Sequence, residues 1–268
     1  MAESQPGLGG EARLDSLSVD EWLGGRLTLI QPRKGHRIGS DAVLLSAAAG
    51  SVEGPIVDVG AGVGAVGLAV ASRSACATAD LVEIDPELAR LASGNAERNA
   101  LTFRIRVLQV DVGDAQARRA AGLVDEAADC VVTNPPFFDP REVRVSPDPS
   151  RARSHAFSLR AKGDPPVVGW IRACLALLAP GGRLVMIHRP EALAQILTAA
   201  ENRAGGLTLL PVHPRAGASA HRLLISAVKG SKAPLRIAPA LVLHQTDGRL
   251  TAEADAIHRG EALIDWSA

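Results

Sequence analysis

One short segment limits the folds open to this chain more than any other. The β-branched apolar run Ile56–Val59 passes directly into a glycine-rich turn, and a stretch of small, helix-compatible residues follows. Gly60, Gly62 and Gly64 let this turn be tight and let a ligand approach the backbone closely. Strand, glycine turn and helix in this order are typical of parallel α/β sheets, in which a ligand binds where the helix begins. The segment therefore predicts an α/β fold with a binding site at this turn.

The pattern of the following residues fits a parallel sheet. From residue 55 to residue 188, strand-like apolar runs alternate with helical patterns, which implies parallel strands joined by crossover helices. Residues 207–212 and 222–228 read as an antiparallel pair that closes the sheet. The chain has 268 residues, 47% of them hydrophobic, so it can bury a sizeable core.

The glycine pattern alone leaves the cofactor open. Gly62-x-Gly64-x-x-Gly67 also matches the fingerprint of dinucleotide-binding sites. Asp58, however, comes just before the first glycine, and its negative charge suits a cofactor that carries an ammonium and a sulfonium group. This favours S-adenosylmethionine over a nicotinamide dinucleotide.

A second motif supports that choice. Asn134, Pro135, Pro136 and Phe137 directly follow the apolar run 130–133, which reads as a buried strand. The prolines stiffen the backbone and leave its carbonyls free to accept hydrogen bonds, and the Asn side chain adds another oxygen acceptor. Phe137 offers a flat face on which a base or an amide can stack. These features suit the methylation of a planar amine, whereas the alternative is a proline-rich turn with Phe137 in the core.

Acidic residues come at the ends of the next two strand-like runs. Glu83 is placed to accept hydrogen bonds from both ribose hydroxyls of an adenosyl cofactor. Asp85, just before Pro86, is interpreted instead as the cap of the following helix. Asp111 either accepts from the adenine amino group or caps a short helix near Asp114.

Positive charge gathers in two parts of a chain whose net charge is zero. The first is the long aperiodic segment 139–164, and the second is 206–246, which contains no Asp or Glu. Basic segments near a site can bind phosphate backbones, and a solvated basic surface is the alternative. The candidate RNA-binding residues are Arg141, Arg144, Arg151, Arg153, Arg215 and Arg222.

Together these motifs resemble the class I S-adenosylmethionine-dependent methyltransferases of the amino-methylating group. Segments 23–27, 31–45 and 213–248 also resemble the bacterial tRNA(Val) adenine-N6 methyltransferase family. The resemblance implies a Rossmann-like α/β fold with a seven-stranded, mostly parallel sheet, an antiparallel carboxyl-terminal strand pair and helices on both faces. The cofactor-binding residues that it implies are Arg37, Gly39, Ser40, Asp41, Asp58, Gly60, Ala61, Gly62, Gly64, Glu83, Ile84, Asp111, Val112 and Asn134.

The function that the resemblance implies is transfer of a methyl group from S-adenosylmethionine to the exocyclic N6 of an adenine in RNA, with tRNA favoured. The Asn134 side-chain oxygen and the Pro135 carbonyl would accept hydrogen bonds from the two amino hydrogens, and Phe137 would stack on the base. No metal is expected to take part. The same site could act on a protein glutamine amide, another RNA or a small molecule. A non-catalytic RNA-binding module is the third alternative.

The remaining features fit a cytoplasmic protein that is a monomer or a homodimer. No signal peptide is visible, and the apolar runs are too short to span a bilayer. Cys76, Cys130 and Cys174 lie in apolar surroundings without metal-binding spacing, so we expect three reduced core residues. Three segments are expected: a disordered tail at 1–19, an amino-terminal extension and lid at 20–50, and a methyltransferase domain at 51–268.

Overall fold

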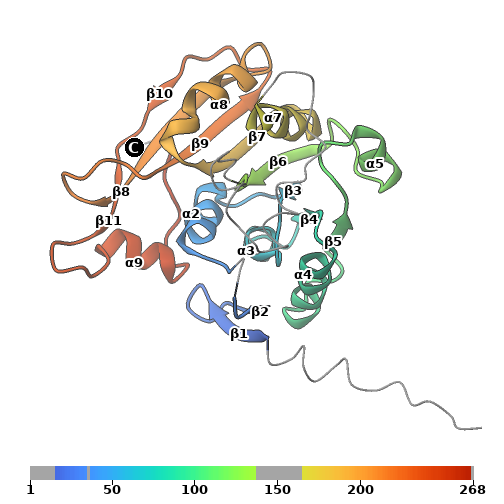
Figure 1. Cartoon of the computed structure of the whole chain (residues 1–268), viewed down its shortest axis with the longest axis horizontal. Helices are drawn as coiled ribbons and strands as arrows, with labels where there is room; N and C mark the ends of the chain where they lie inside the picture. The colour runs from blue at the N-terminus through green and yellow to red at the C-terminus, as the bar shows by residue number, and fades with distance from the viewer. Residues whose placement is uncertain (1–15, 35–36, 137–164, 267–268) are drawn as a thin grey trace, which may run out of the picture.

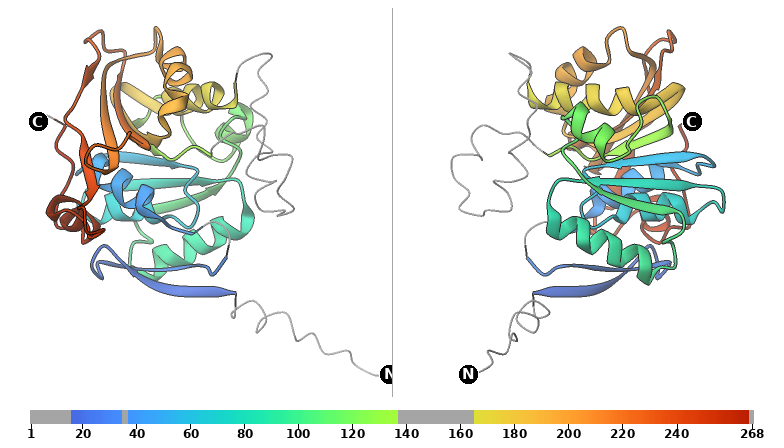
Figure 2. Two further views of the ribbon diagram at one scale, coloured as in Figure 1. Left: turned by 60° about the vertical axis from the view of Figure 1, so that its left-hand side comes forward. Right: turned by 90° about the vertical axis from the view of Figure 1, so that its right-hand side faces the viewer.

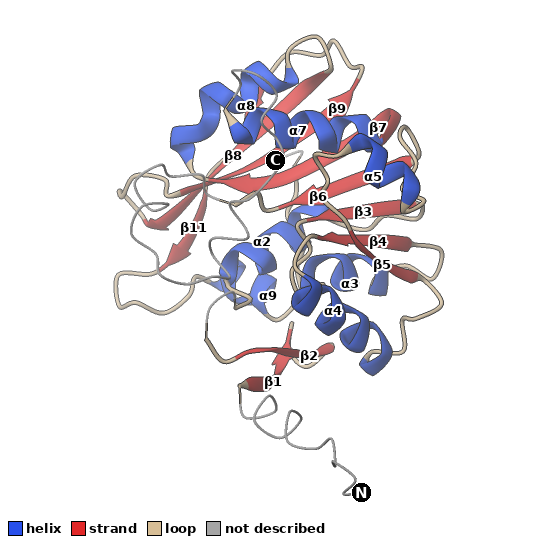
Figure 3. Ribbon diagram, turned by 45° about the vertical axis from the view of Figure 1, so that its right-hand side comes forward, coloured by secondary structure: helices blue, strands red, loops and turns tan. Residues whose placement is uncertain are grey.

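The computed structural model describes residues 16–34, 37–136 and 165–266, and there a central sheet is covered by helices on both faces (Figures 1 and 3). Its strands are β3 (Pro55–Val59), β4 (Thr78–Glu83), β5 (Ile105–Gln109), β6 (Ala128–Thr133), β7 (Leu178–His188), β8 (Ala204–Arg215), β9 (Arg222–Lys229), β10 (Arg236–Ile237) and β11 (Leu241–His244). They lie in the order β10-β8-β9-β7-β6-β3-β4-β5, and β11 pairs with β8 as well.

The sheet is parallel except around β9, which is antiparallel to both β7 and β8. This confirms a mostly parallel sheet with an antiparallel pair near the carboxyl end. The expected number of seven strands is too small, because the sheet has nine strands in the described part of the chain. The two additional strands, β10 and β11, are short segments that pair with β8. Strands this short do not show a recognisable alternation of apolar and polar residues in the sequence.

Helices cover the sheet in two groups, each over its own cluster of buried apolar side chains. One face carries α2 (Ser40–Ala49), α3 (Ala65–Ser72), α4 (Pro86–Arg98) and α9 (Ala252–His258), and the other carries α5 (Ala115–Ala120), α7 (Pro166–Leu177) and α8 (Leu193–Ala200), which follows the 3₁₀ turn η1 (Pro190–Ala192). In β3, Ile56 packs in the first cluster and Val57 and Val59 pack in the second. A strand buried on both faces is a continuous apolar run, which explains why the sequence pattern identified it.

Two helices on the carboxyl side of the strands start with acidic caps. Asp85 accepts hydrogen bonds from two backbone N–H groups in the first turn of α4, and Pro86 is the first helical residue, as expected. Asp114 caps α5 in the same way, so Asp111 is not the cap of that helix. The strand before it, β5, ends at Gln109, which leaves Asp111 in the loop that follows.

A separate antiparallel hairpin lies beside α4 (Figure 2). It consists of β1 (Leu17–Trp22) and β2 (Leu27–Pro32). The pairing begins at Leu17, inside the segment 1–19 that was expected to be a tail, and residues 1–15 lie outside the described residues. The chain then reaches α2, which starts at Ser40.

The cysteines are all free, but they do not share one environment. Cys130 and Cys174 are buried as expected, and burial raises the pKa of the Cys130 thiol to about 11. Cys76 is exposed, so the prediction of a core position is wrong for this residue. It lies in the short turn before β4, where the local apolar composition does not decide burial.

Candidate active site

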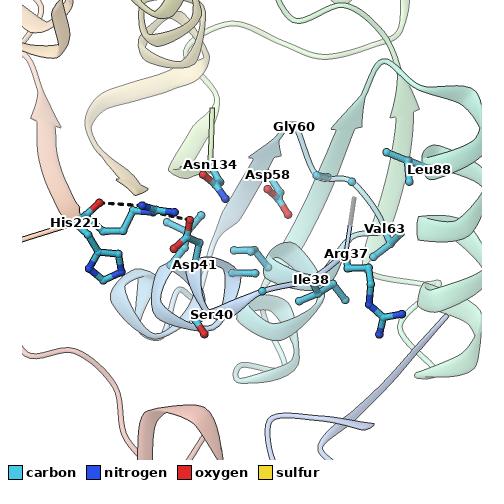
Figure 4. Close-up of a pocket in the computed structure, with 18 residues that line it drawn as sticks. Arg37, Ile38, Ser40, Asp41, Asp58, Gly60, Val63, Leu88, Asn134 and His221 are labelled. Atoms are coloured by element: carbon cyan, nitrogen blue, oxygen red, sulfur yellow. Dashed lines mark hydrogen bonds and ion pairs between the residues drawn. The ribbon is translucent and has the colours of Figure 1, made fainter. Parts of the chain in front are cut away.

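A cavity of about 530 Å³ opens at the carboxyl ends of β3 and β6 (Figure 4). Because β3 lies between β4 and β6, the strand order reverses here, and open α/β sheets bind ligands in the crevice at such a switch point. Segments at the start of α2 and of β9 border the cavity as well. Among its lining residues are these predicted ones: Arg37, Gly39, Ser40, Asp41, Asp58, Gly60, Ala61, Gly62, Asn134 and Arg222.

The other predicted site residues fall into two groups. Gly64, Glu83, Ile84, Asp111, Val112, Pro135, Pro136 and Arg215 are described but do not line this cavity. Phe137, Arg141, Arg144, Arg151 and Arg153 lie outside the described residues.

The glycines of the turn that follows β3 have left-handed backbone conformations, which fits the tight turn expected from the sequence. The φ angles are +75° at Gly60, +57° at Gly62 and +86° at Gly64. A Cβ added to Gly62 would meet nothing within 4 Å, so this residue leaves open space beside the cavity. A Cβ on Gly64 would lie 2.8 Å from a methyl carbon of Leu81. Gly62 therefore makes room for a ligand, while Gly64 allows α3 to pack closely against β4.

Asp58 places a buried carboxyl at the cavity. Its side chain is 2% exposed, and its Oδ2 accepts a hydrogen bond from the Gly67 N–H at 2.8 Å. Burial raises the pKa of this carboxyl to about 7, against the opposing effect of the Gly67 bond and with a further rise from the charge of Glu83. A positively charged ligand in the cavity would stabilise the ionised carboxylate of Asp58 and lower its pKa.

Glu83 supports the glycine turn directly. Its Oε2 accepts from the Gly62 N–H at 2.8 Å and its Oε1 from the Asp85 N–H at 2.9 Å. Burial raises the pKa of this carboxyl as well. Each carboxylate oxygen can accept a second hydrogen bond, so these contacts are compatible with the ribose role predicted from the sequence. Asp111 has its own local contact, because its Oδ1 accepts from the Gly113 N–H at 2.8 Å.

Asn134 provides a buried oxygen that could accept a hydrogen bond from a ligand. It follows β6 directly and lines the cavity close to Asp58 (Figure 4). Its Oδ1 is buried and has no hydrogen-bond partner among the described residues. Leaving a buried acceptor unmatched costs free energy, and such atoms in native proteins commonly have a functional reason. A ligand N–H donor would remove this cost.

The strand ends beneath Asn134 are tied together by a buried hydroxyl. Thr133 Oγ1 donates to the Val59 carbonyl at 2.8 Å and accepts from Trp170 Nε1 at 2.9 Å. These bonds join β6, β3 and α7 at one point. They fix the carboxyl ends of the two strands that carry Asn134 and Asp58.

Comparison with known proteins places this fold and cavity in a family. Residues 36–151 match the methyltransferase small domain. A tRNA1(Val) (adenine(37)-N6)-methyltransferase of Porphyromonas gingivalis is 32% identical over 165 residues, which are 60% of this chain and 61% of that protein. The protein of the same description from Aeromonas salmonicida is 30% identical over 199 residues, 72% of this chain and 77% of that one. This chain belongs to their methyltransferase family.

A solved structure extends the similarity over most of the chain. The crystal structure of an Agrobacterium tumefaciens protein described as a predicted O-methyltransferase has a TM-score of 0.68 and 34% identity. The match covers 84% of this chain and 98% of that one. By contrast, the chain spans only 61% of the Porphyromonas relative. The structural match to the Agrobacterium protein is therefore more complete than the sequence match to the Porphyromonas relative.

The cavity of this methyltransferase also contains groups that sequence reasoning missed. Arg222, expected to bind RNA, donates to Asp41 Oδ2 at 2.8 Å and to the His221 carbonyl at 2.9 Å. It therefore pairs with a residue that was assigned to the cofactor. No sequence signal connects positions 41 and 222. The lining residues absent from the sequence prediction are Ile38, Ala42, Leu45, Val63, Ala65, Val66, Leu88 and His221.

The described part of the chain contains neither a metal cluster nor a membrane span. Within residues 16–34, 37–136 and 165–266, no three His, Cys, Asp or Glu side chains come close enough to hold a metal ion. In the same ranges, no helix has the length and apolar character needed to cross a membrane.

The Thr133 contacts predict a loss of stability on mutation. Thr133→Val keeps the side-chain volume but removes the acceptor for Trp170 Nε1 and the donor to Val59. Since a buried polar group that loses its partner costs about 1–3 kcal/mol, we expect the free energy of unfolding to fall by about that amount. Urea denaturation measures it, with Thr198→Val at an exposed position of α8 as the control that should change little. Equal midpoints for both variants would contradict this role of Thr133.

Proposed function

We propose that this protein transfers a methyl group from S-adenosylmethionine to the exocyclic N6 of an adenine in tRNA. The observation that carries the proposal is the Asn134 amide oxygen, buried beside the cavity with no partner among the described residues. Its neighbour in the cavity wall, Asp58, is a carboxyl suited to a cationic ligand. An amine acceptor and a cation-binding acid in one cavity fit a methyl donor and an amino substrate.

The residues present fit S-adenosylmethionine. Asp58 would pair with the ammonium group of the cofactor. The open space beside Gly62 would let the cofactor lie along the glycine turn. Glu83 would accept from the ribose hydroxyls and Asp111 from the adenine amino group. When bound, the cofactor supplies an activated methyl group on a sulfonium. These roles extend the sequence predictions and agree with the positions of Asp58 and Gly62 in the cavity wall.

The chemistry assigned to Asn134 and Pro135 follows from the electronic structure of the amine. The lone pair of an adenine amino group is delocalised into the ring, so the nitrogen is a poor nucleophile. If Asn134 Oδ1 and the Pro135 carbonyl accept hydrogen bonds from its two N–H groups, the nitrogen is drawn toward tetrahedral geometry and its lone pair becomes available. The residues thus act by positioning and polarisation. Phe137, outside the described residues, would stack the base.

Several observations support RNA as the substrate. Relatives that are 29–38% identical are described as tRNA1(Val) (adenine(37)-N6)-methyltransferases. Arg215 is exposed at the end of β8, next to the strand whose start borders the cavity. The sequence that follows the Asn-Pro-Pro motif contains Arg141, Arg144, Arg151 and Arg153.

We propose further that the reaction takes place in the cytoplasm and that the enzyme is a monomer or a homodimer.

Mass analysis of digested tRNA tests the proposal. Unmodified tRNA would be incubated with the purified protein and S-adenosylmethionine, digested to nucleosides and analysed for N6-methyladenosine, with Asn134→Ala as the slow control. The expected result is N6-methyladenosine that the wild-type protein forms at least about 100-fold faster than the variant. Methylated glutamine in a protein substrate, with no modified nucleoside, would favour the glutamine-amide alternative instead.

Salt-dependent binding provides a second test of the RNA assignment. Arg215→Glu should weaken tRNA binding. It should also make the fall of log affinity with log salt less steep, by about 0.7 for each phosphate that the protein no longer neutralises. Lys232→Glu is the matched control, because this exposed lysine lies beyond the opposite end of β9. Identical affinities and slopes for the two variants would show that Arg215 does not touch the RNA.

A further inference from the structure

Helix α4 and its C-cap residue, Asn99, present two asparagine amides to the edge of β2 that does not pair with β1. Asn99 accepts from the Thr28 N–H and donates to the Thr28 carbonyl, both at 2.9 Å. Asn95 accepts from the Ile30 N–H at 2.7 Å and donates to the Ile30 carbonyl at 3.0 Å. Four residues of helix rise about 6 Å and two residues of strand rise about 6.6 Å, so the two spacings match. The amides therefore pair with β2 as a neighbouring strand would.

The two asparagines pair with β2 in the same way, but they use their remaining hydrogen differently. Each amide has two N–H donors, and one of them goes to β2. The second donor of Asn99 goes to the Asn95 carbonyl of its own helix at 2.8 Å. The second donor of Asn95 goes to the Val63 carbonyl at 2.9 Å. Val63 lies between Gly62 and Gly64 and lines the cavity, so Asn95 alone of this pair connects the hairpin to the glycine turn.

The hairpin reaches the cavity by a second route. Gln31 is buried in β2, and its Oε1 accepts from the Ile38 N–H at 2.8 Å. Its Nε2 donates to Asp20 Oδ2 at 2.7 Å, and the same oxygen pairs with Arg37 at 3.2 Å. Arg37 and Ile38 both line the cavity. Side chains of the hairpin thus contact the cavity wall at Arg37 and Ile38, while Asn95 ties β2 to the glycine turn.

We propose that Asn95 is a positioning residue that couples the amino-terminal hairpin to the glycine turn of the cofactor site. It is fully buried, and its three hydrogen bonds use both N–H donors and one of the two acceptor sites of its oxygen. The Val63 carbonyl is flanked by two left-handed glycines, whose backbones are intrinsically mobile, and Asn95 holds it in one orientation. Separation of β2 from α4 therefore loosens the turn, and cofactor binding opposes that separation. This inference rests on the proposed function, since it takes the cavity to be a cofactor site.

Hydrogen exchange on the wild-type protein tests the coupling without any mutation. Ile30 does not line the cavity, and because ligand binding also slows exchange that requires global unfolding, each change at Ile30 is taken relative to the amides of the central sheet. If the coupling exists, S-adenosylhomocysteine should slow exchange of the Ile30 amide by about fivefold or more, the lower end of typical coupling between sites. Exchange that is unchanged in protein saturated with ligand overturns the proposal. Failure of S-adenosylhomocysteine to bind at all would instead overturn the proposed function.

The matched variants Asn95→Ala and Asn99→Ala separate positioning from general loosening of the hairpin. Both remove two hydrogen bonds to β2, so both should speed exchange in residues 27–32. Only Asn95→Ala should weaken S-adenosylhomocysteine binding, by about 5- to 150-fold, as measured by calorimetry at a temperature where circular dichroism shows both proteins folded. Equal affinities of the two variants would contradict the role given to Asn95. Should Asn95→Ala not fold, the wild-type exchange measurement still decides the question.

Discussion

Replacing Asn134 with alanine is expected to slow methyl transfer by about 10²–10³-fold, the usual effect of removing one preorganised polar group at a reacting centre. The buried Oδ1 is the acceptor that would polarise the amino group, and alanine cannot replace it. The effect should fall on kcat, because the group acts on the reacting nitrogen rather than on distant parts of the substrate. Single-turnover kinetics with saturating tRNA and S-adenosylmethionine measure the methyl-transfer step.

Cofactor affinity serves as the control for this variant. Asp58 and the glycine turn come from β3 and the start of α3, and the Thr133 bonds that fix β6 do not involve the Asn134 side chain. Asn134→Ala should therefore bind S-adenosylhomocysteine nearly as well as the wild type. A variant that kept wild-type turnover would reduce Asn134 to a turn residue after β6.

The second large effect concerns Asp58 and depends on pH. Without ligand, burial holds the pKa of its carboxyl at about 7. A bound ammonium group requires the ionised form, so affinity for S-adenosylhomocysteine should fall about tenfold for each pH unit below that pKa, or about 100-fold at pH 5. Calorimetry between pH 5 and pH 8.5 tests this dependence, and binding should release protons near pH 7. An affinity independent of pH over this range would exclude Asp58 as the partner of the ammonium group.

Asp58→Asn should separate binding from stability. Loss of a charged hydrogen bond typically costs about 1.5–3 kcal/mol, so we expect the affinity for S-adenosylhomocysteine to fall by about 10- to 150-fold above pH 7. The pKa of Asp58 in the folded protein lies above the ordinary value of an aspartate carboxyl, so the stability that the wild-type carboxyl contributes is lost as the pH rises through about 7. The ligand-free variant lacks this loss. It should therefore melt above the ligand-free wild type at pH 8, and the difference should shrink as the pH falls.

A matched control for Asp58→Asn is available on α5. Asp114→Asn makes the same chemical change on an exposed side chain that does not line the cavity, and asparagine is an equally good helix cap. It should leave ligand affinity and the pH dependence of melting unchanged. A similar loss of affinity in both variants would point to a general effect of net charge.

Features that depend on a few neighbouring residues were predictable from the sequence. The left-handed φ angles at Gly60, Gly62 and Gly64 reflect a requirement that glycine meets best, and the cap at Asp85 follows from one side chain and the next two amides. The continuous apolar run of β3 identified a strand buried on both faces. Such signals lie within one turn or one strand, so the order of residues contains them.

The tertiary structure alone decided which distant residues meet. Asp41 and Arg222 are 181 positions apart, yet they form an ion pair in the cavity wall. Asn95 reads as one polar residue of an amphipathic helix, but the fold places it between β2 and the glycine turn, 65 and 32 positions away. Glu83, expected at the ribose, also holds the Gly62 amide. Long polar side chains can reach several partners, and only packing of the helices on the sheet selects among them, which is why these contacts left no pattern in the sequence.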